Sequence, residues 1–470
     1  MKNVTIDGNG ARLITHGEMT TFVLDSCENI VMRNFTLTSA DPSVPEMTVI
    51  ETGKDYITSR VHPSSHYEIN DGVFRWIGKG WQFSGGLAQV FYQETNITNR
   101  CESPMSGICK AEETEAGIVR FHYEKEHPFH TGEVYQMRHT IRNEVCGLIQ
   151  RSKNVLLEDL QIYFLGNFGI VGQYSENLTY RRLWCAPEPG SGRTCAGFAD
   201  FVQMSGCKGR INIEDSYFEG AHDDAINIHG THLKVTELLD KNRIRVRFMH
   251  GQSYGFAAFS KGDKIELTDI HTLLCVEKAT VKQTEHIDDY EIILTLDKDI
   301  SANMKNKDDI VVENVTWTPD VVIRNNYFSR LPTRGVLVTT RGKVCIENNI
   351  FYRLPMPAIL ISDDARSWYE SGPVRDVTIR YNRFIEGGSP VIAIAPENNR
   401  YEGGVHRNIT IDSNRFKIKS GNIIEARLSD NIFVTGNVVE TPSDREFSDY
   451  IRFEKCNDVS VERNRTVHTY

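Results

Sequence analysis

A short pattern of alternating apolar and polar residues returns along most of the chain. In each copy a turn residue precedes Asn or Asp, an alternating run of aliphatic residues follows, and Asn with an aromatic residue closes the copy. Clear copies are KNVTIDGNG from Lys2, ENIVMRNFTLTS from Glu28, GRINIEDSYFEG from Gly209, GKVCIENNIFYRL from Gly342 and RNITIDSNRFKI from Arg407. Consecutive copies recur about every 20 to 35 residues, the period expected of a solenoid coil.

Within a copy, the period of two predicts a β-strand with one buried face. A second apolar run between copies predicts another strand in each coil, and alignment of these runs gives two inward columns. The first column contains Val202, Ile226, Val336, Ile359 and Ile392. The second contains Met204, Ile228, Val338, Ile361 and Ile394. Stacked aliphatic ladders are typical of a parallel β-helix, whereas a Greek-key sandwich needs hairpin turns that are few here. We predict an all-β, right-handed parallel β-helix.

Two segments interrupt the repeat and divide the predicted β-helix into three parts. The coils occupy residues 1–51, 149–231 and 317–470. Residues 52–148 and 232–316 contain alternating strand-like runs without the coil pattern, so each predicts a small inserted antiparallel β-barrel-like domain that walls a cleft. Exposed strand edges on these insertions favour a homodimer. The chain enters directly on a repeat, and we expect the first coil to be missing.

The charge balance restricts the partners of the chain. Its 470 residues carry 63 acidic and 53 basic side chains, a net charge of −10. Nucleic acid and anionic membranes need a dense basic patch, so neither is an expected partner, and a polyanionic substrate is disfavoured. A neutral sugar fits best. No apolar run reaches the roughly 20 residues that span a bilayer, and the N-terminus does not resemble a signal peptide.

The ten cysteines show no CxxC spacing, so they predict neither a metal site nor a dense disulfide framework. Cys101 with Cys109, and Cys185 with Cys195, lie in Gly-, Pro- and Ser-rich stretches and could form local bridges. A buried free thiol is the alternative for each pair and the expected state of the others. We expect no metal and no other cofactor.

The stretch from Gly190 to Leu233 holds three carboxylates at strand openings. Asp200 opens one inner strand, and the Asp223–Asp224 pair opens the next strand, one coil later. Because adjacent strands are roughly 4.8 Å apart, these side chains should form one cluster. Like charges this close cannot all ionise, so at least one carboxyl should keep its proton near neutral pH.

A protonated carboxyl beside an ionised one is what glycoside hydrolysis requires. The spacing leaves the stereochemistry open: retaining enzymes hold their two carboxyls about 5–5.5 Å apart and inverting enzymes about 6.5–9.5 Å apart. A single Asp at a solenoid bend usually caps a turn. Three on consecutive coils favour catalysis.

Several polar neighbours accompany the carboxylates. His229 shares the outward parity of Asp223 and Asn227, so it could bond a carboxylate, and His222 directly precedes the pair. Arg334 falls in the same column as Asp224 on the next aligned coil, where it could hold a sugar hydroxyl or lower the pKa of one carboxylate. Each of these side chains could instead be a surface group without a catalytic partner.

Further candidates lie near the strand ends. Trp184 precedes the site by one coil and could form a sugar-stacking wall, although a core position is the commoner fate of such a residue. Glu219, Asp363 and Asp364 are possible substrate contacts. The Asp363–Asp364 pair closes its strand whereas the catalytic pair opens one.

The site motifs resemble those of a known family. The Asp200 … Asp223-Asp224 … His229-Gly230 arrangement is similar to the signature of polygalacturonase-type β-helix hydrolases. More closely, PGSGRTCAGFADFVQM from Pro189 and EGAHDDAINIHGTHLKV from Glu219 resemble glycoside hydrolase family 110, exo-acting α-1,3-galactosidases that cleave blood-group-B-type termini. The resemblance covers most of the chain.

This resemblance implies inverting, metal-independent hydrolysis of a terminal α-linked galactose from an oligosaccharide. By position, Asp223 would be the general acid, and Asp200 with Asp224 would position and activate the water. The natural precursor is expected to be secreted or periplasmic.

Two other functions are weighed against this one. A polygalacturonase-like hydrolase of pectin would need a groove lined with Lys and Arg, which the acidic net charge disfavours. A non-catalytic glycan-binding β-helix would tolerate loss of Asp223.

Overall fold

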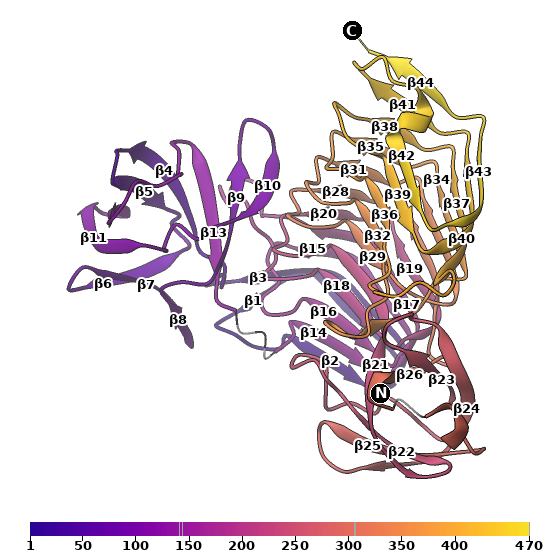
Figure 1. Cartoon of the computed structure of the whole chain (residues 1–470). Coiled ribbons are helices and arrows are strands. Elements are labelled where there is room, and N and C mark those ends of the chain that lie inside the picture. The colour runs from indigo at the N-terminus through magenta and orange to yellow at the C-terminus, as the bar shows by residue number, and fades with distance from the viewer. Residues whose placement is uncertain (141, 143, 305–306, 470) are drawn as a thin grey trace.

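The computed structural model describes residues 1–140, 142, 144–304 and 307–469. In these residues the chain is built almost entirely of strands, and helix is confined to short 3₁₀ turns, η1 (Ser301–Asn303), η2 (Lys307–Asp309) and η3 (Phe447–Tyr450). None of the helices in the described part of the chain is long and apolar enough to cross a membrane. The strands form one tall stack of coils with two lobes attached (Figure 1).

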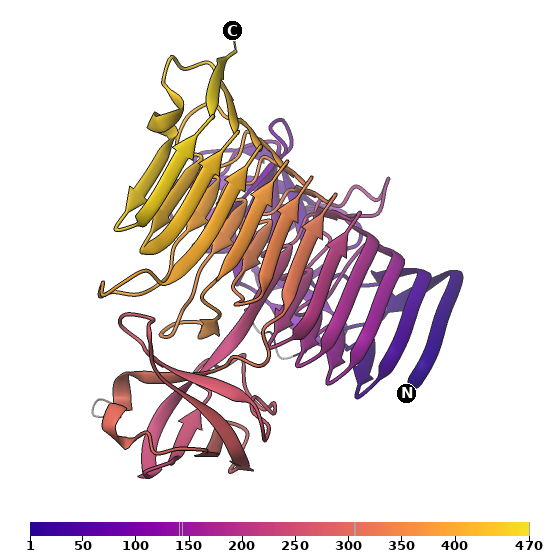
Figure 2. The same cartoon turned by 90° about the vertical axis from the view of Figure 1, so that its right-hand side faces the viewer.

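One parallel sheet runs along the whole stack, as Figure 2 shows from the N-terminal to the C-terminal coils. Its longer strands are β1 (Lys2–Thr15), β3 (Glu28–Ser39), β15 (Lys153–Ile162), β17 (Glu176–Cys185), β19 (Lys208–Glu214), β27 (Asp320–Arg324), β30 (Lys343–Glu347), β34 (Asp376–Arg380), β37 (His406–Asp412), β40 (Ser429–Thr435) and β43 (Asn457–Glu462). After a bend follow the shorter strands β20 (Tyr217–Glu219), β28 (Tyr327–Ser329), β31 (Ile350–Tyr352), β35 (Arg383–Ile385), β38 (Arg415–Lys417), β41 (Val438–Thr441) and β44 (Arg465–His468). β3 pairs with β15, and β19 with β27, so the coils stay in register across both insertions.

A second parallel stack carries the functional site. Its strands are β2 (Phe22–Asp25), β14 (Gly147–Gln150), β16 (Ile170–Gln173), β18 (Val202–Ser205), β21 (Ile226–Asp240), β29 (Val336–Val338), β32 (Ile359–Ile361), β36 (Ile392–Ile394), β39 (Ile424–Arg427) and β42 (Ile451–Glu454). The pairing reproduces both predicted columns: Val202 lies opposite Ile226, Ile226 opposite Val336, and Ile359 opposite Ile392. The members of both columns are buried. The predicted parallel β-helix is confirmed.

Two further ladders run along the stack, one of Phe side chains on the shorter strands and one of Asn side chains at the bends before them. Phe218, Phe328, Phe351, Phe384 and Phe416 stack with ring centroids 4.8 to 5.4 Å apart. Buried Asn side chains bond from coil to coil, each Oδ1 accepting the backbone N–H and side-chain amide of the preceding ladder residue, along Asn326, Asn349, Asn382, Asn414 and Asn437. These bonds satisfy backbone groups that a bend leaves without sheet partners.

The first insertion stands to one side of the coils (Figure 1). Its main antiparallel sheet, in the order β10-β9-β13-β4-β5-β12-β11, comprises β4 (Glu46–Thr52), β5 (Tyr56–Val61), β9 (Leu87–Tyr92), β10 (Ile97–Cys101), β11 (Ile108–Glu115), β12 (Ile118–Tyr123) and β13 (Glu133–Arg138). A small sheet adds β6 (His66–Asn70), β7 (Val73–Gly78) and β8 (Trp81–Phe83). β4 pairs with β5 and β13, so residues 46–51, which we assigned to the coils, lie in this sheet.

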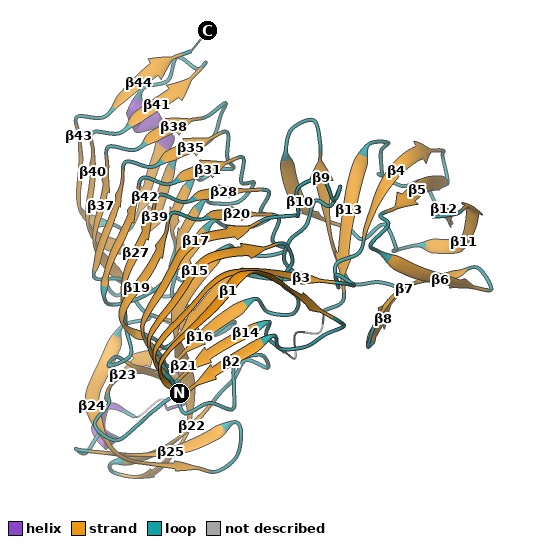
Figure 3. Ribbon diagram, turned by 180° about the vertical axis from the view of Figure 1, so that it is seen from behind, coloured by secondary structure: helices purple, strands orange, loops and turns teal. Residues whose placement is uncertain are grey.

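The second insertion grows directly out of the β-helix. Strand β21 begins as an inner strand of the coil and runs on without a break into the antiparallel sheet. That sheet also contains β22 (Arg243–Arg247), β23 (Lys264–Asp269), β24 (Cys275–His286), β25 (Glu291–Leu296) and β26 (Ile310–Asn314). The short strand β33 (Glu370–Ser371) pairs with β21 at the junction. Figure 3 shows the two insertions on different sides of the stack.

The suggested disulfides do not form, and all ten cysteines are free thiols. Cys101 lies on β10 and Cys109 on β11, which are the two opposite edges of one sheet. Cys185 and Cys195 are both buried but pack in separate apolar clusters. β10 and β11 do not pair with each other, so Cys101 and Cys109 are not cross-strand neighbours.

Candidate active site

The β-helix brings Asp200, Asp223 and Asp224 together as predicted. Because Val202 of β18 pairs with Ile226 of β21, the residues before these strands also lie side by side. One oxygen from each of the three carboxylates lies within 4.8 Å of the others. The backbone N–H of Asp224 donates to Oδ1 of Asp200 at 3.2 Å, which ties the two coils together at the cluster.

The cluster forms part of the wall of a cavity of about 520 Å³. The opposite parts of this wall come from the loop between β32 and β33 and from the second insertion, whose His250, Gln252 and Ser253 line it. The side chain of Asp223 is 14% exposed and that of Asp224 only 2%. Asp223 is therefore the carboxylate of this pair that a ligand in the cavity can reach most directly.

Three arginines neutralise two of the carboxylates. Nη2 of Arg100 lies 2.9 Å from Oδ1 of Asp223, and Nη2 of Arg142 lies 2.8 Å from its Oδ2. Arg334 donates its backbone N–H to Oδ1 of Asp224 at 3.0 Å and its guanidinium to Oδ2 at 2.7 Å. The predicted proximity of Arg334 to Asp224 is therefore present in the structure.

These contacts separate the proton affinities of the three groups. Burial, together with the charges of Asp223 and Asp224, raises the pKa of Asp200 well above its usual value. Burial would also raise the pKa of Asp223, but Arg100, Arg142 and Arg334 outweigh it and the pKa is lowered. For Asp224, burial outweighs Arg334 and the pKa is raised. The site thus combines a carboxyl that favours its proton with one that favours the ionised form, the pairing that acid–base catalysis uses.

His229 and Asn227 surround a carboxylate that the sequence analysis did not single out, Glu370. Nε2 of His229 lies 3.5 Å from Oε1 of Glu370, and Nδ2 of Asn227 donates to the same oxygen at 3.2 Å. His229 thus lies beside a carboxylate, as the sequence suggested, but this carboxylate is Glu370 and not one of the three aspartates. Its other ring nitrogen contacts the carbonyl oxygen of Gly230 at 2.6 Å. Asn227 and Glu370 line the cavity.

His222 is buried behind the cluster. Burial and the charges of Arg138, Arg100 and Arg142 lower its pKa well below the usual value, so the ring is neutral. Its Nε2 has no hydrogen-bond partner among the described residues. His222 is not part of the cavity lining, so a direct substrate contact is not indicated.

Trp368 and Phe168 are the aromatic residues of the cavity lining, and Trp184 lies elsewhere. Trp184 lies on β17, on the outer face of the other sheet, where it stacks on Tyr217 with ring centroids 4.3 Å apart. Trp368 lines the cavity, is 50% exposed, and packs against His250 at 4.5 Å between centroids. Trp368 was missed because it lies in a loop without the repeat pattern.

Of the other acidic candidates, only Asp364 reaches the cavity. Its carboxylate accepts backbone N–H groups of Ser367, Trp368 and Tyr369 and so holds the loop that presents the indole. Asp363 is buried against His232 at 3.2 Å. Glu219, the last residue of β20, forms an ion pair with Arg330 at 3.1 Å and is not part of the cavity lining.

Both insertions match described domain families. Residues 45–134 match the family model of GLAA-B beta-barrel domain I, and residues 243–310 match that of GLAA-B beta-barrel domain II. Among solved structures, that of PfbA, a surface adhesin of Streptococcus pneumoniae, has 13% sequence identity and a TM-score of 0.34, over 70% of this chain and 76% of that chain.

Curated relatives match along nearly the whole chain. Alpha-1,3-galactosidase A of Bacteroides thetaiotaomicron is 48% identical over 470 residues, which cover 99% of this chain and 83% of that protein. The proteins of the same name from Bacteroides fragilis and Akkermansia muciniphila are 39% and 38% identical, over 84% and 92% of this chain and 66% and 72% of their own lengths. At this identity and coverage, the chain belongs to the alpha-1,3-galactosidases, glycoside hydrolase family 110, the family that its motifs resemble.

Proposed function

We propose that this protein is an exo-glycosidase that hydrolyses terminal α-1,3-linked galactose from oligosaccharides such as blood-group-B-type glycans, with inversion at the anomeric carbon. The observation that carries the proposal is the cluster of Asp200, Asp223 and Asp224 in one cavity wall, with pKa values shifted in opposite directions. The names of the relatives supply the substrate class.

Asp223 is the proposed general acid because it is the more exposed member of the Asp223–Asp224 pair. In this structure Asp223 favours the ionised form and Asp200 favours its proton. The acid role therefore requires that the proton passes from Asp200 to Asp223 when substrate binds, through a water or a sugar hydroxyl between carboxylates whose oxygens lie within 4.8 Å. This one transfer creates both an acid, Asp223, and a base, Asp200.

Hydrolysis then returns the site to its resting state. The bond between the anomeric carbon and the glycosidic oxygen breaks, and that oxygen takes the proton from Asp223. Water, held by Asp200 and Asp224, forms the new bond to the anomeric carbon and gives a proton to Asp200. Asp223 is again ionised and Asp200 again protonated, the distribution that the surroundings of the two groups favour.

The contacts of the carboxylates favour water over a side chain as the nucleophile. Both oxygens of Asp224 are engaged by Arg334, and both oxygens of Asp223 by arginines. Asp200 is buried and its Oδ1 accepts the backbone N–H of Asp224, which disfavours direct attack on carbon. The short separation of the carboxylates would by itself fit a retaining enzyme, whose two carboxyls lie about 5–5.5 Å apart. Family membership and the engaged oxygens argue for inversion.

The cavity suits a neutral sugar and a short leaving group. Its lining carries more acids than arginines, which disfavours a polyuronate. A second cavity of about 550 Å³ adjoins it and shares Arg142, Phe168 and Gln252 with it. We propose that galactose occupies the first cavity and the next sugars of the chain extend into the second.

Galactose release from a Galα1-3Gal-containing oligosaccharide, measured beside reducing-sugar release from polygalacturonate, tests this function. We expect turnover of the oligosaccharide only. Activity on polygalacturonate alone would indicate a pectin hydrolase instead. If neither substrate is hydrolysed and Asp223→Asn still binds the oligosaccharide as wild type does, the protein is a non-catalytic glycan-binding protein.

A further inference from the structure

The first insertion supplies a side chain to the reacting carboxyl. Arg100 lies on β10 of that insertion and reaches across to Asp223 on the β-helix, with Nη2 2.9 Å from Oδ1. Its side chain is 55% exposed, whereas that of Arg142, the other partner of Asp223, is 9% exposed. Arg100 is therefore the partner that can leave Asp223 for a ligand at low cost.

Arg100 is the last member of a polar row that crosses four neighbouring strands. Glu46 on β4 lies directly opposite Gln136 on β13, Gln136 opposite Gln89 on β9, and Gln89 opposite Arg100 on β10. Directly opposed residues of an antiparallel sheet share one face, so the whole row faces the same way. Glu46, Gln136 and Gln89 are at most 1% exposed.

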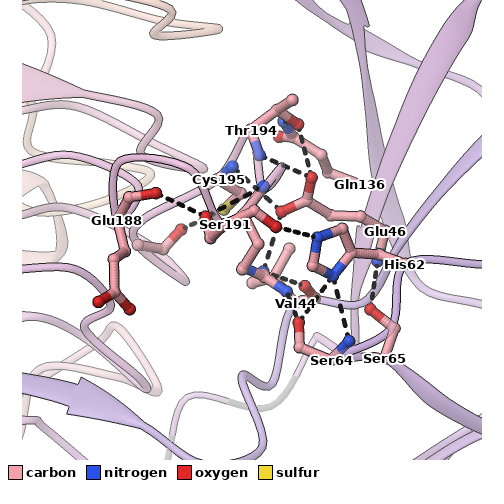
Figure 4. Close-up of polar contacts among 12 residues, drawn as sticks. Val44, Glu46, His62, Ser64, Ser65, Gln136, Glu188, Ser191, Thr194 and Cys195 are labelled. Carbon is pink, nitrogen blue, oxygen red and sulfur yellow. Dashed lines mark hydrogen bonds and ion pairs between the residues drawn. The ribbon is translucent and has the colours of Figure 1, made fainter.

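Glu46 anchors the row to the chain just before Asp200 (Figure 4). Its Oε2 accepts the backbone N–H of Thr194 at 2.8 Å and the hydroxyl of Thr194 at 2.6 Å. Its Oε1 accepts the backbone N–H of Cys195 at 3.1 Å and lies 2.9 Å from Nη2 of Arg193. Every acceptor position of this buried carboxylate is used, so it fixes both the strand and the loop.

The two glutamines continue the connection toward Arg100. Gln89 donates from Nε2 to Oε1 of Gln136, and Gln136 donates from Nε2 to Oγ1 of Thr194 at 2.5 Å. Nε2 of Gln89 also lies 3.4 Å from the carbonyl oxygen of Ala221, two positions before Asp223. The row thus contacts the loop before Asp200 at one end and the loop before Asp223 at the other.

We propose that the first insertion is a working part of the catalytic site: the row from Glu46 to Gln89 positions Arg100, and Arg100 holds Asp223 ionised until a substrate hydroxyl engages the guanidinium. This inference rests on the proposed function, in which Asp223 must gain a proton to act. Glu46 and the glutamines are positioning residues, because they act through Arg100. Exchange of a guanidinium partner for a neutral sugar hydroxyl would favour proton transfer to Asp223 only when substrate is present.

Other charged groups around Asp223 also influence its pKa. Arg142 approaches from the segment between β13 and β14, Arg334 from the coil that follows, and Asp200 and Asp224 from the cluster itself. Arg138 on β13 adds a more distant positive charge. These remain when Arg100 is removed, so its removal should shift the titration of Asp223 and should not abolish it.

The test is the pH profile of kcat/KM for the full chain carrying Arg100→Ala. The pH profile of kcat/KM reports the free enzyme, in which Asp223 must be ionised to receive the proton of Asp200. Loss of a cation raises the pKa of Asp223, so the acidic limb should move up by about 0.5 to 1 pH unit. Arg100→Lys should restore most of the wild-type profile. Arg75→Ala is the matched control and should leave the profile unchanged, because Arg75 lies in the same insertion and its ion-pair partner among the described residues is Glu68, at 3.9 Å.

The variant Glu46→Gln tests whether Glu46 positions Arg100 or only stabilises the fold. We expect a smaller shift of the same limb in the single variant, and no further shift when Glu46→Gln is added to Arg100→Ala. The inference is overturned if wild type and Arg100→Ala have identical pH profiles. It is also overturned if the shift in the double variant equals the sum of the shifts in the two single variants.

A second measurement does not need activity. The melting temperature of wild type minus that of Arg100→Ala should grow as pH rises from about 3 to 6, because the ion pair requires ionised Asp223. If this pH-dependent difference in melting temperature is present but wild type does not hydrolyse the α-galactoside, the proposed function is wrong and the ion pair between Arg100 and Asp223 is still supported. A flat difference overturns the Arg100 inference whatever the activity.

Discussion

Arg334 holds both oxygens of Asp224, one through its backbone N–H at 3.0 Å and the other through its guanidinium at 2.7 Å. Asp224 is almost fully buried, with 2% of its side chain exposed. A buried carboxylate held at both oxygens keeps a fixed orientation, which suits a group that positions water rather than one that attacks carbon.

Removal of Arg334 should therefore damage both stability and turnover. Arg334→Ala leaves a buried carboxylate without its partner, a change that typically costs about 3–5 kcal/mol. We expect a clear drop in melting temperature and at least about a tenfold loss of kcat. Arg324→Ala is the control, because it removes a more exposed ion pair with Glu214, between β27 and β19. It should change the melting temperature and kcat only slightly. Wild-type kcat in a folded Arg334→Ala protein would argue against the role of Asp224.

Asp200 should destabilise the fold at neutral pH. Its folded pKa is raised, so between about pH 4 and that higher value the native state binds a proton that the unfolded chain has lost. Stability from this group therefore falls as pH rises through the window. Asp200→Asn keeps an oxygen for the N–H of Asp224 but cannot ionise.

We expect the melting temperature of Asp200→Asn to exceed that of wild type by several degrees at pH 8 and by little at pH 4, while activity is lost. Calorimetry across this range measures the difference. If the difference between the two proteins does not change with pH, Asp200 does not carry a raised pKa.

Trp368 should contribute to substrate binding and Trp184 should not. Trp368 presents a half-exposed indole to the cavity, and an aromatic contact is worth about 0.5–1.5 kcal/mol beyond area. Trp368→Ala should raise KM by about three- to tenfold, because a sugar face loses its platform. Trp184→Ala is the matched control on the opposite sheet. Equal effects of the two substitutions on KM would contradict the placement of the sugar.

The repeat explains why the coils and the carboxylate cluster could be predicted. Val202 and Ile226 occupy equivalent places in successive copies, so their pairing follows from the period, and Asp200 and Asp224 inherit that register. The sequence could not decide between a bridge and free thiols at Cys101 and Cys109, because the order of strands in an insertion is not visible in local patterns.

The rest of the site comes from segments outside the repeat. Arg100, Arg142, Trp368 and Glu370 lie in the first insertion or in connecting segments, and their place depends on how those segments pack against the coils. Trp184 was misplaced for a related reason. Alternation shows that a side chain points outward, but it does not tell which outer face of a coil borders the cavity.

The general acid can be tested by substitution. Asp223→Asn keeps the shape of the side chain but cannot donate a proton of suitable acidity, so turnover should fall at least about a hundredfold. Circular dichroism should show an unchanged strand content. Near-wild-type release of galactose from the folded variant would assign the acid to another residue.

The anomer that the enzyme first releases tests the account most directly. Proton NMR of wild-type protein with a Galα1-3Gal-containing oligosaccharide, recorded before mutarotation, shows the substrate, the linkage and the stereochemistry in one reaction. Hydrolysis by water held at Asp200 and Asp224 predicts β-galactose as the first product. Initial release of α-galactose would show retention and contradict the assigned roles, and no release of galactose would contradict the function itself.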